Sequence, residues 1–437
     1  MSTPKTDNKE RVHFRRGWIY VLMLALVTVN YIDRSALALV ARDIAAEFKL
    51  SPVQMGYLFS SFFWSYVICL LPIGIMLDRF GVRNVNSAGV ALWSVAIAAI
   101  AAVWSFSSLI LIQLVMGAGE ATSIPACGRT VREWMPARER GIASVVYSAG
   151  AFVGPAIGAV VVAGIASMWG WRAVFIVLGA LGFAWLVCNL VWFDRPERVK
   201  WLSPEERRKI VTERGTAARE DIAARGHVAV VFELLKSPSM WGALIAQAAG
   251  VYTLNLLLFW LPTYLQTTKN LTGMKTGFYT AVPWAIAVPI SIALAVLSDR
   301  LLSGTALLAG KRRLAIVGCV LLAAMLLLVP FTNDTRVILA LFAVSLGGIS
   351  ATISLNVALV TDLVHRPRDV GKAISLTVLS GNVGGLLAPI ITGYVVAGLR
   401  KYDWAFGIAG ILLLVGAVAV GTMTRNVILA EDDAMPA

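Results

Sequence analysis

The first long apolar segment of the chain, residues 17–40, contains two adjacent charged residues, Asp33 and Arg34. Spanning a bilayer takes about 20 apolar residues, so this segment is long enough to do so. A charge near the middle of a membrane helix costs on the order of 3 kcal/mol, usually offset by a partner, a polar cavity or water. Neighbours along a helix point in different directions, so Asp33 and Arg34 need different partners. Two interpretations remain: an anchor at the membrane interface, or a binding or proton site, which the following apolar residues 35–40 favour.

A second acidic residue, Glu120, lies in an apolar segment at residues 107–127, just after Gly117 and Gly119. Burial desolvates a carboxyl group and favours its protonated form, so Glu120 could carry a proton. The alternative is a structural ion pair with Arg34 or Arg129. Along one helix Arg129 would lie about 13 Å from Glu120, so we expect Arg34 to be the partner. Its planar guanidinium group suits a carboxylate.

The composition requires many membrane spans around these residues. Hydrophobic residues make up 58% of the 437 and charged residues 14%, whereas a soluble domain carries about 25% charged residues. Apolar windows predict twelve spans, separated after the sixth by one long polar stretch. We therefore expect an N-terminal six-helix bundle at 1–193, a linker at 194–238 and a C-terminal six-helix bundle at 239–437. The spans are expected near 17–40, 53–77, 84–104, 107–127, 142–164, 171–193, 239–263, 275–298, 312–331, 336–362, 370–397 and 403–424.

The distribution of basic residues predicts the orientation. Most Lys and Arg fall on the side shared by the termini and the linker, so we expect both termini to be cytoplasmic and the protein to lie in a bacterial-type inner membrane. The net charge of +13 therefore does not indicate nucleic-acid binding. The four cysteines and three histidines show no metal-site or disulfide spacing, and no nucleophile with a base lies in the spans. We expect no cofactor and no enzymatic activity. The opposite loops hold only Arg42, Lys49, Lys269, Lys275, Arg336, Arg400 and Lys401.

A charged motif follows the second predicted span and is partly repeated after the eighth. Glycine allows helices to approach closely, and an Asp with nearby Arg can form a breakable charge cluster that stabilises one of two conformations. The alternative is a charged turn that fixes topology. Two related halves predict a substrate site between them, near the membrane midplane. The residues concerned are Gly74, Asp78, Arg79, Gly81 and Arg83, with Asp299 and Arg300 in the second copy.

At this motif and span position the chain resembles the major facilitator superfamily of secondary transporters. The resemblance implies an all-α membrane protein with twelve transmembrane helices in two six-helix halves. A finer resemblance, to the anion:cation symporter family and its galactonate-type sugar-acid symporters, is carried by residues 31–34, 117–126, 260–265 and 381–389. It implies proton-coupled import of a small organic anion, such as a sugar acid. Asp33 and Glu120 would be the proton-titrating pair, Arg34 the substrate-binding arginine, and Tyr31, Tyr66 and Asn382 pocket residues.

The chain also departs from that family pattern. Gln113 stands where the family often has Arg, which leaves Arg34 as the only cationic side chain expected at the midplane. We therefore expect a preference for monocarboxylates. We add Gln113, Tyr252 and Asn255 to the candidate substrate-binding residues, since Tyr252 matches Tyr31 in the second half. The expected partners are the organic anion, protons and the lipid bilayer, with a monomeric protein.

Two other functions stay open. A glycine pattern in the fifth span nearly matches one found in drug/proton antiporters of the same superfamily, which would export their substrate. The same glycines could simply allow close helix packing. A sensor or scaffold without transport is a different class, and the chain shows no appended signalling domain. The glycines are Gly141, Gly150, Gly154 and Gly158.

Overall fold

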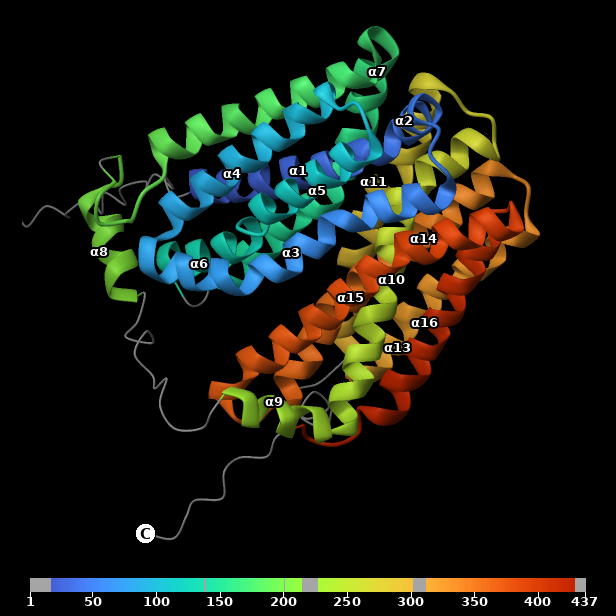
Figure 1. The fold of residues 1–437 in the computed structure, drawn as a ribbon. Helices are drawn as coiled ribbons and strands as arrows, with labels where there is room; N and C mark the ends of the chain where they lie inside the picture. Colours follow the sequence, from blue (N-terminus) through green and yellow to red (C-terminus); the bar gives the residue numbers. More distant parts are fainter. Residues whose placement is uncertain (1–16, 137–138, 200, 214–226, 302–311, 429–437) are drawn as a thin grey trace, which may run out of the picture.

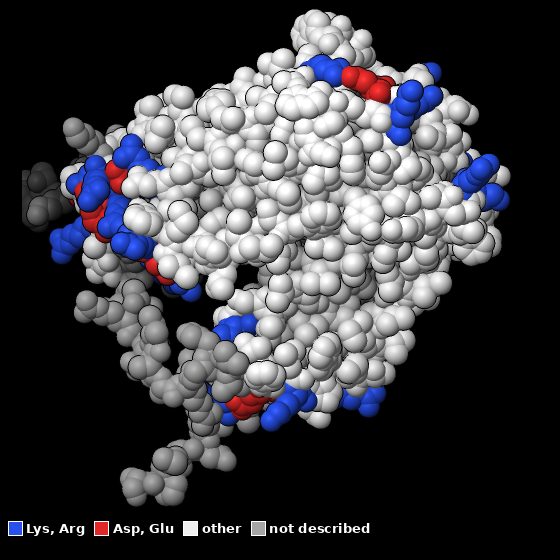
Figure 2. Space-filling view, viewed as in Figure 1, with Lys and Arg blue, Asp and Glu red and all other residues white. Residues whose placement is uncertain are grey.

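The computed structural model describes residues 17–136, 139–199, 201–213, 227–301 and 312–428. Within these ranges the chain forms helices and no β-strand. Eleven helices are long and apolar enough to cross a membrane, which confirms an all-α, multi-pass membrane protein. Figure 2 shows charged side chains at the two ends of the face in view, with an uncharged surface between them. Large apolar side chains such as Ile68 and Leu71 are exposed at the surface of the molecule, as contact with lipid requires.

The spans follow the apolar windows closely. Most predicted bounds agree within three residues, and several helices extend further at the ends than predicted. Short helices outside the spans are α2 (Ala41–Phe48), α8 (Pro204–Glu213) and α9 (His227–Lys236). The helices that make up the spans are α1 (Gly17–Leu39), α3 (Pro52–Phe80), α4 (Val82–Ala99) with η1 (Ile100–Ala102), α5 (Phe106–Glu120) with α6 (Ser123–Trp134), α7 (Arg140–Trp192), α10 (Pro238–Thr267), α11 (Gly273–Leu301), α13 (Arg312–Ala323) with η3 (Ala324–Phe331), α14 (Thr335–Leu363), α15 (Pro367–Leu399) and α16 (Asp403–Met423).

One helix, α7, covers two predicted spans. It is 53 residues long and is interrupted at Gly170, whose φ of 79° and ψ of 169° are not helical. A residue with a side chain rarely adopts this positive φ, which explains the glycine. Two helices therefore meet at Gly170. The expected number of twelve passes depends on each of these two helices crossing the bilayer, and it stays a prediction.

The fourth span is irregular directly after Glu120. The α-helix α5 ends at Glu120 and α6 begins at Ser123. Between them the backbone N–H of Thr122 donates to Gly119 O at 3.3 Å, and the Thr122 hydroxyl donates to the same oxygen at 2.9 Å. This tighter turn places Glu120 at a helix end inside the membrane region, where the regular backbone pattern is broken.

The helices are arranged in two groups. Figure 1 shows α1–α7 in one group and α10–α16 in the other, with α8 beside the first and α9 beside the second. We call the end that carries α8 and α9 the linker end, and the end that carries α2 the far end. The division at 1–193, 194–238 and 239–437 agrees with the end of α7 at Trp192 and the start of α10 at Pro238, although the unit boundaries themselves stay a prediction.

The two groups contact each other closely toward the far end. A methyl group added at Gly56 of α3 would lie 2.5 Å from the carbonyl oxygen of Pro389 in α15. In the same pair of helices the Tyr57 and Tyr394 hydroxyls are 3.1 Å apart. The second pair, α7 and α11, meets at Gly277, where an added methyl group would lie 2.6 Å from Ala159 O. At the linker end the groups diverge, and Figure 2 shows an open space between them.

Candidate functional site

A buried ion pair between α1 and α5 lies at the centre of the candidate site. Arg34 Nε donates to Glu120 Oε2 at 2.8 Å. The Arg34 side chain is 8% exposed and the Glu120 side chain is not exposed at all. The predicted partnership of Glu120 with Arg34 rather than Arg129 is therefore confirmed, and the membrane-interface interpretation of Arg34 is wrong in this structure because the side chain is turned inward.

Each member of the pair keeps one polar atom available. Arg34 Nη2 and Glu120 Oε1 are buried and have no hydrogen-bond partner in the described part of the chain. The guanidinium carbon lies 4.4 Å from the centre of the Phe62 ring, 4.9 Å from that of Tyr31 and 5.0 Å from that of Tyr66. Such cation–π contacts orient an arginine without using its hydrogen-bond donors. The site thus holds a fixed cation with a donor still free.

Asp33, the residue before Arg34, is 1% exposed. Neither of its carboxyl oxygens has a hydrogen-bond partner of normal geometry among the described residues. The side chain that faces it is the indole of the buried Trp93 in α4. A buried carboxyl group that forms neither an ion pair nor a hydrogen bond is poorly stabilised as an anion. This arrangement suits a group that holds a proton in at least one state.

Glycines let the helices around the site approach one another. A methyl group at Gly117 would lie 2.2 Å from Phe62 O, and one at Gly119 would lie 2.9 Å from Gly89 O. On α7, added methyl groups at Gly150 and Gly154 would lie 2.8 Å from Thr28 N and 2.7 Å from Tyr31 Cβ. Three of the four glycines in the fifth-span pattern, Gly150, Gly154 and Gly158, therefore pack α7 against α1, the helix that carries Asp33 and Arg34, whereas Gly141 has nothing within 4 Å of an added methyl group.

The other predicted substrate-binding residues differ in whether they contact Arg34. Tyr31 and Tyr66 contact Arg34, as described above. Gln113 is 4% exposed, and its Oε1 has no partner in the described chain; it precedes Glu120 by about 10 Å along α5. In the second half, Asn255 donates to Val251 O of its own helix at 2.9 Å. Tyr252 is buried and Asn382 half-buried, and no hydrogen bond found in the described chain joins these three residues to Arg34.

Aromatic residues that the sequence analysis missed connect the two halves next to this site. The Phe59 ring of α3 stacks on Phe259 of α10 with centroids 5.3 Å apart, and it meets Trp260 edge-on at 5.5 Å. Phe63 also contacts Phe259 at 6.3 Å. The sequence could have indicated this contact surface, because it places aromatic residues three and four positions apart, on one face of the second span.

The predicted charge cluster after the second span has different partners from those expected. Asp78 forms its ion pair with Arg129 of α6, which also contacts Glu133 at 3.3 Å. Arg79 is exposed and lies over the Phe80 ring. In this conformation Asp78 therefore forms a charge contact between two helices, as expected, but its partner is Arg129 of α6 rather than Arg79 or Arg83.

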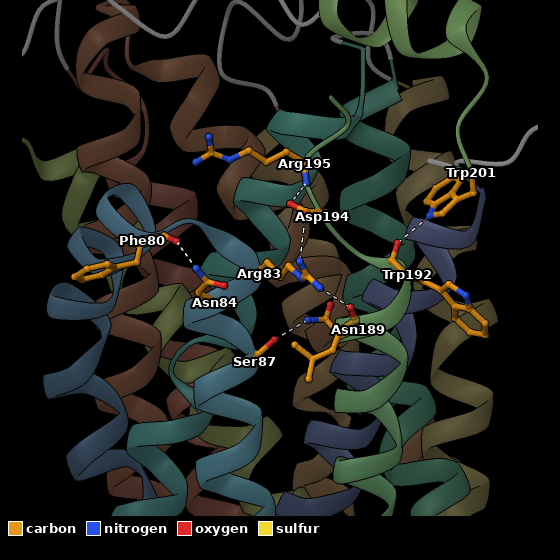
Figure 3. Close-up of polar contacts among 10 residues, drawn as sticks. Phe80, Arg83, Asn84, Ser87, Asn189, Trp192, Asp194, Arg195 and Trp201 are labelled. Carbon is orange, nitrogen blue, oxygen red and sulfur yellow. Dashed lines mark hydrogen bonds and ion pairs between the residues drawn. The ribbon is translucent and has the colours of Figure 1, made fainter. Parts of the chain in front are cut away.

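Arg83 instead joins α4 to the end of α7 (Figure 3). Its Nη1 contacts Asp194 Oδ2 at 2.9 Å and its Nη2 donates to Leu190 O at 2.6 Å. One turn further, Asn189 donates to Ser87 at 3.0 Å. The turn between α3 and α4 is made by Gly81, whose φ of 80° favours glycine.

Two other expectations about this motif change. Gly74 has nothing within 4 Å of an added methyl group, so it does not bring two helices together in this conformation. In the second copy Arg300 is exposed at the end of α11, and the side chain of Asp299 lies outside the described part. The second half has an ion pair that the motif did not predict, between Arg312 and Asp362 at 2.8 Å.

The fold and the buried ion pair define a polytopic helical transport protein. The model of the Major Facilitator Superfamily matches residues 23–310 and 305–427. The chain belongs to the major facilitator superfamily and is a transporter, not an enzyme.

Comparison with individual proteins agrees with this assignment. The chain is 30% identical to the D-galactonate transporter of Escherichia coli O6:H1 over 430 residues, which are 96% of both chains. It is 29% identical to the probable galactarate/D-glucarate transporter GarP of Escherichia coli K12, covering 98% of this chain and 97% of GarP. A crystal structure of a bacterial homolog of the human lysosomal transporter Spinster, inward-facing and occupied, matches with a TM-score of 0.71 at 18% identity, covering 94% of this chain and 97% of that one.

Proposed function

We propose that this protein is a proton-coupled symporter that imports a small organic anion carrying one carboxylate, such as a sugar acid. The observation that supports this most directly is the buried contact of Arg34 with Glu120 at 2.8 Å. A guanidinium group is the natural receptor for a carboxylate, and here it is already occupied by one that can be protonated. The descriptions of two relatives, a D-galactonate transporter and a probable galactarate/D-glucarate transporter, support an organic acid as the substrate.

The coupling follows from a competition for Arg34. When Glu120 is ionised, it pairs with Arg34 and neutralises its charge. When Glu120 takes up a proton, the pair loses its ionic character and the guanidinium group is free for the carboxylate of the substrate. One guanidinium can neutralise only one carboxylate, and a second buried anion left without a partner would cost several kcal/mol. Substrate and proton therefore bind together.

Asp33 supplies a second proton site. A monoanion carried with one proton moves no net charge, so the membrane potential does not drive it. With a second proton on Asp33 each cycle would move one positive charge inward, worth about 2.3 kcal/mol per 100 mV. The burial of Asp33 without a cationic partner among the described residues supports a role as the second carrier.

The arrangement of the two halves supports alternating access. The halves touch toward the far end through Gly56, Gly277 and the Phe59–Phe259 stack, whereas they diverge at the linker end. The bias of Lys and Arg toward the linker end indicates that this end is cytoplasmic. In this conformation the Arg34 site would therefore face the cytoplasm, with the linker and both termini on the same side of the inner membrane.

The single buried arginine supports a monocarboxylate. Among the described residues, Arg34 is the one Lys or Arg with a buried side chain. Gln113, which the family comparison predicts could be Arg, contributes a neutral amide. Export by proton antiport was the other candidate. Its basis was the glycine pattern of the fifth span, and the packing of Gly150, Gly154 and Gly158 against α1 accounts for three of those four glycines without reference to export.

Transport by the purified protein in liposomes tests the proposal. With an acidic exterior, radiolabelled D-galactonate or D-gluconate should accumulate above its external concentration. A protonophore and the Arg34→Ala variant should each abolish the accumulation. If an acidic interior rather than an acidic exterior drove uptake, the protein would be an antiporter. If no carboxylate were accumulated under either gradient, the proposed function would be wrong.

A further inference from the structure

A separate cavity of about 320 Å³ lies between the two halves at the far end. Its walls come from the junction of α1 and α2, from α7, and from the ends of α10 and α11 that face each other. Small-molecule sites typically enclose about 300–1,000 Å³, so the volume suits a small metabolite. None of the residues around Arg34 and Glu120 lines it. The cavity is therefore distinct from the candidate transport site.

Two buried polar atoms in the wall of this cavity lack partners. Thr276 of α11 is 2% exposed, and its hydroxyl has no hydrogen-bond partner in the described chain. Gln266 of α10 donates its amide N–H to Leu39 O at 3.1 Å, while its buried Oε1 has no partner there. Buried polar groups are nearly always hydrogen-bonded in native proteins. A free hydroxyl and a free acceptor in one cavity indicate that something polar fills it.

Charged residues complete the lining from the other half. Arg42 and Asp43, both exposed, stand in the first turn of α2 and line the cavity. Ser167 of α7 also lines it and presents its hydroxyl oxygen, because the hydroxyl proton is donated to Gly164 O at 2.8 Å. The walls therefore offer one cation, one anion, one free hydroxyl and several acceptors.

Helix α2 is held firmly at its other end, which fixes the position of Arg42. Arg172 of α7 donates two hydrogen bonds to Glu47, at 2.9 and 2.5 Å, and Trp171 donates a third at 3.0 Å. The hydrogen bonds from Arg172 lower the pKa of the Glu47 carboxyl below its usual value. Glu47 is therefore ionised at neutral pH, and its contacts with Arg172 and Trp171 persist there. The positive φ of Gly170 turns Trp171 and Arg172 toward α2.

We propose that this cavity is a second binding site, which takes a small hydroxylated monocarboxylate from the far side of the membrane. Arg42 binds the carboxylate, since a guanidinium group pairs with it in a planar, charge-assisted contact. Hydroxyl groups of the ligand donate to Gln266 Oε1 and accept from Thr276. Asp43 accepts a further hydroxyl and repels a second carboxylate, so diacids are disfavoured.

A ligand in this position bridges the halves. Arg42 belongs to the first half, whereas Gln266 and Thr276 belong to the second. The cavity has this shape only while the far ends of the halves are together. A ligand that binds one conformation better shifts the population toward it. Occupancy of the second site therefore holds the protein in the conformation seen here.

Equilibrium binding of radiolabelled D-gluconate to the full-length protein in nanodiscs tests the second site. The Arg34→Ala variant removes the central site, so it isolates the cavity. We expect one saturable site to remain, and Arg42→Gln or Thr276→Val in that background to weaken it at least about tenfold, the size of one lost charge-assisted hydrogen bond. Arg336→Gln removes another exposed arginine at the far end, and Thr280→Val removes a buried hydroxyl one turn from Thr276 that does not line the cavity. Neither control should change binding.

The outcomes separate this proposal from the proposed function. If the Arg34→Ala variant bound no D-gluconate, the cavity would hold water only and the second site would be refuted. The same conclusion would follow if the binding that remained in this variant were unchanged by Arg42→Gln and Thr276→Val. If residual binding persisted but the unaltered protein showed no Arg34-dependent site, the proposed function would fail and the second site would stand.

Spin labels test the conformational effect in the same Arg34→Ala background. Lys49 and Lys401 are exposed at the far ends of the two halves, and cysteines at these positions in a chain without native cysteines carry the labels. Added D-gluconate should increase the population with the shorter separation, and Arg42→Gln should remove this increase. An unchanged distance distribution at saturating D-gluconate would overturn the bridging role.

Discussion

Arg34 and Glu120, 86 positions apart in the sequence, meet through Arg34 Nε and Glu120 Oε2 at 2.8 Å in the interior of the first half. The ring faces of Tyr31, Phe62 and Tyr66 hold the guanidinium group against this carboxylate. The contact uses one oxygen of Glu120 and leaves Arg34 Nη2 without a partner in the described chain. Half of the bidentate surface of the arginine is thus available to a second carboxylate once the first is neutralised.

Replacing Glu120 with Gln should separate binding from proton coupling. The amide mimics the protonated acid, so Arg34 is permanently free for the substrate. We expect Glu120→Gln to bind the organic anion at least as tightly as the unaltered protein and to lose the dependence of binding on pH. In the unaltered protein binding should strengthen as pH falls, because the protonated fraction of Glu120 rises. Equilibrium binding at several pH values measures this.

The same variant should lose accumulation driven by a pH gradient while it retains exchange of internal for external substrate. Glu205→Gln is a suitable control because Glu205 is an exposed carboxylate on α8, and it should behave like the unaltered protein. Unchanged pH dependence of binding in Glu120→Gln would remove Glu120 from the coupling mechanism.

The second prediction concerns the shape of the Arg34 side chain. Lysine keeps the charge but loses the planar fork and the stacking on the three aromatic rings. We expect Arg34→Lys to weaken substrate binding at least about tenfold, or about 1.4 kcal/mol, and Arg34→Ala to abolish binding at the central site. Binding assays on purified variants measure both. Full affinity in Arg34→Lys would show that the charge alone is recognised.

The sequence was sufficient to predict the spans and the central ion pair for a physical reason. Long apolar windows can only be satisfied by helices in a bilayer, so the helix positions followed from hydropathy. Asp33, Arg34 and Glu120 stood out because isolated charges in such windows need partners. The distance along one helix excluded Arg129 as the partner of Glu120 and left Arg34.

Other features depend on how helices pack, which hydropathy does not record. The partner of Asp78 is Arg129, on a different helix, and the direction in which each side chain leaves its helix decided it. The break after Glu120 arises from a local turn at Thr122. The role of Phe62 became visible only when the structure showed its ring, on α3, against the guanidinium group of Arg34 on α1. The far-end cavity combines residues from α2, α7, α10 and α11, and no spacing in the sequence predicts that combination.

The third prediction uses the ion pair of Asp78 with Arg129. Both side chains are partly exposed, so the pair contributes about 1 kcal/mol at most. Asp78→Asn should therefore change the turnover rate by up to about fivefold and leave substrate affinity nearly unchanged. Arg129→Gln should have at least this effect, because it also removes the contact of Arg129 with Glu133. The double variant should be no worse than Arg129→Gln alone, because the Asp78–Arg129 pair is already lost in that variant. Transport rates and binding constants of the three variants test this.

Arg83 provides the matched comparison for the double-mutant cycle of Asp78 and Arg129. It pairs with Asp194 rather than Asp78, so the effects of Asp78→Asn and Arg83→Gln should add. Coupling between Asp78 and Arg83, with additivity between Asp78 and Arg129, would restore the grouping expected from the sequence motif.

The fourth prediction concerns the contact between the halves. A methyl group at Gly56 would lie 2.5 Å from Pro389 O, and one at Gly393 would lie 2.6 Å from Pro52 O. Overpacking costs about 1–3 kcal/mol, so Gly56→Ala and Gly393→Ala should each shift the equilibrium about tenfold or more away from this conformation. The Lys49 and Lys401 spin labels should then report longer distances. Gly407→Ala, which meets nothing within 4 Å, should leave them unchanged.

The last prediction concerns charge selectivity at Gln113. This residue is 4% exposed, and its Oε1 has no partner in the described chain, so an added charge there would face the interior. With Arg34 as the one buried cation described, the unaltered protein should bind D-galactonate more tightly than the diacid galactarate. Gln113→Arg adds a second cation and should shift this preference toward galactarate, whereas Gln113→Leu, which removes the amide without adding charge, should not. Competition binding with the two acids decides, and tighter binding of galactarate by the unaltered protein would refute a site with a single arginine.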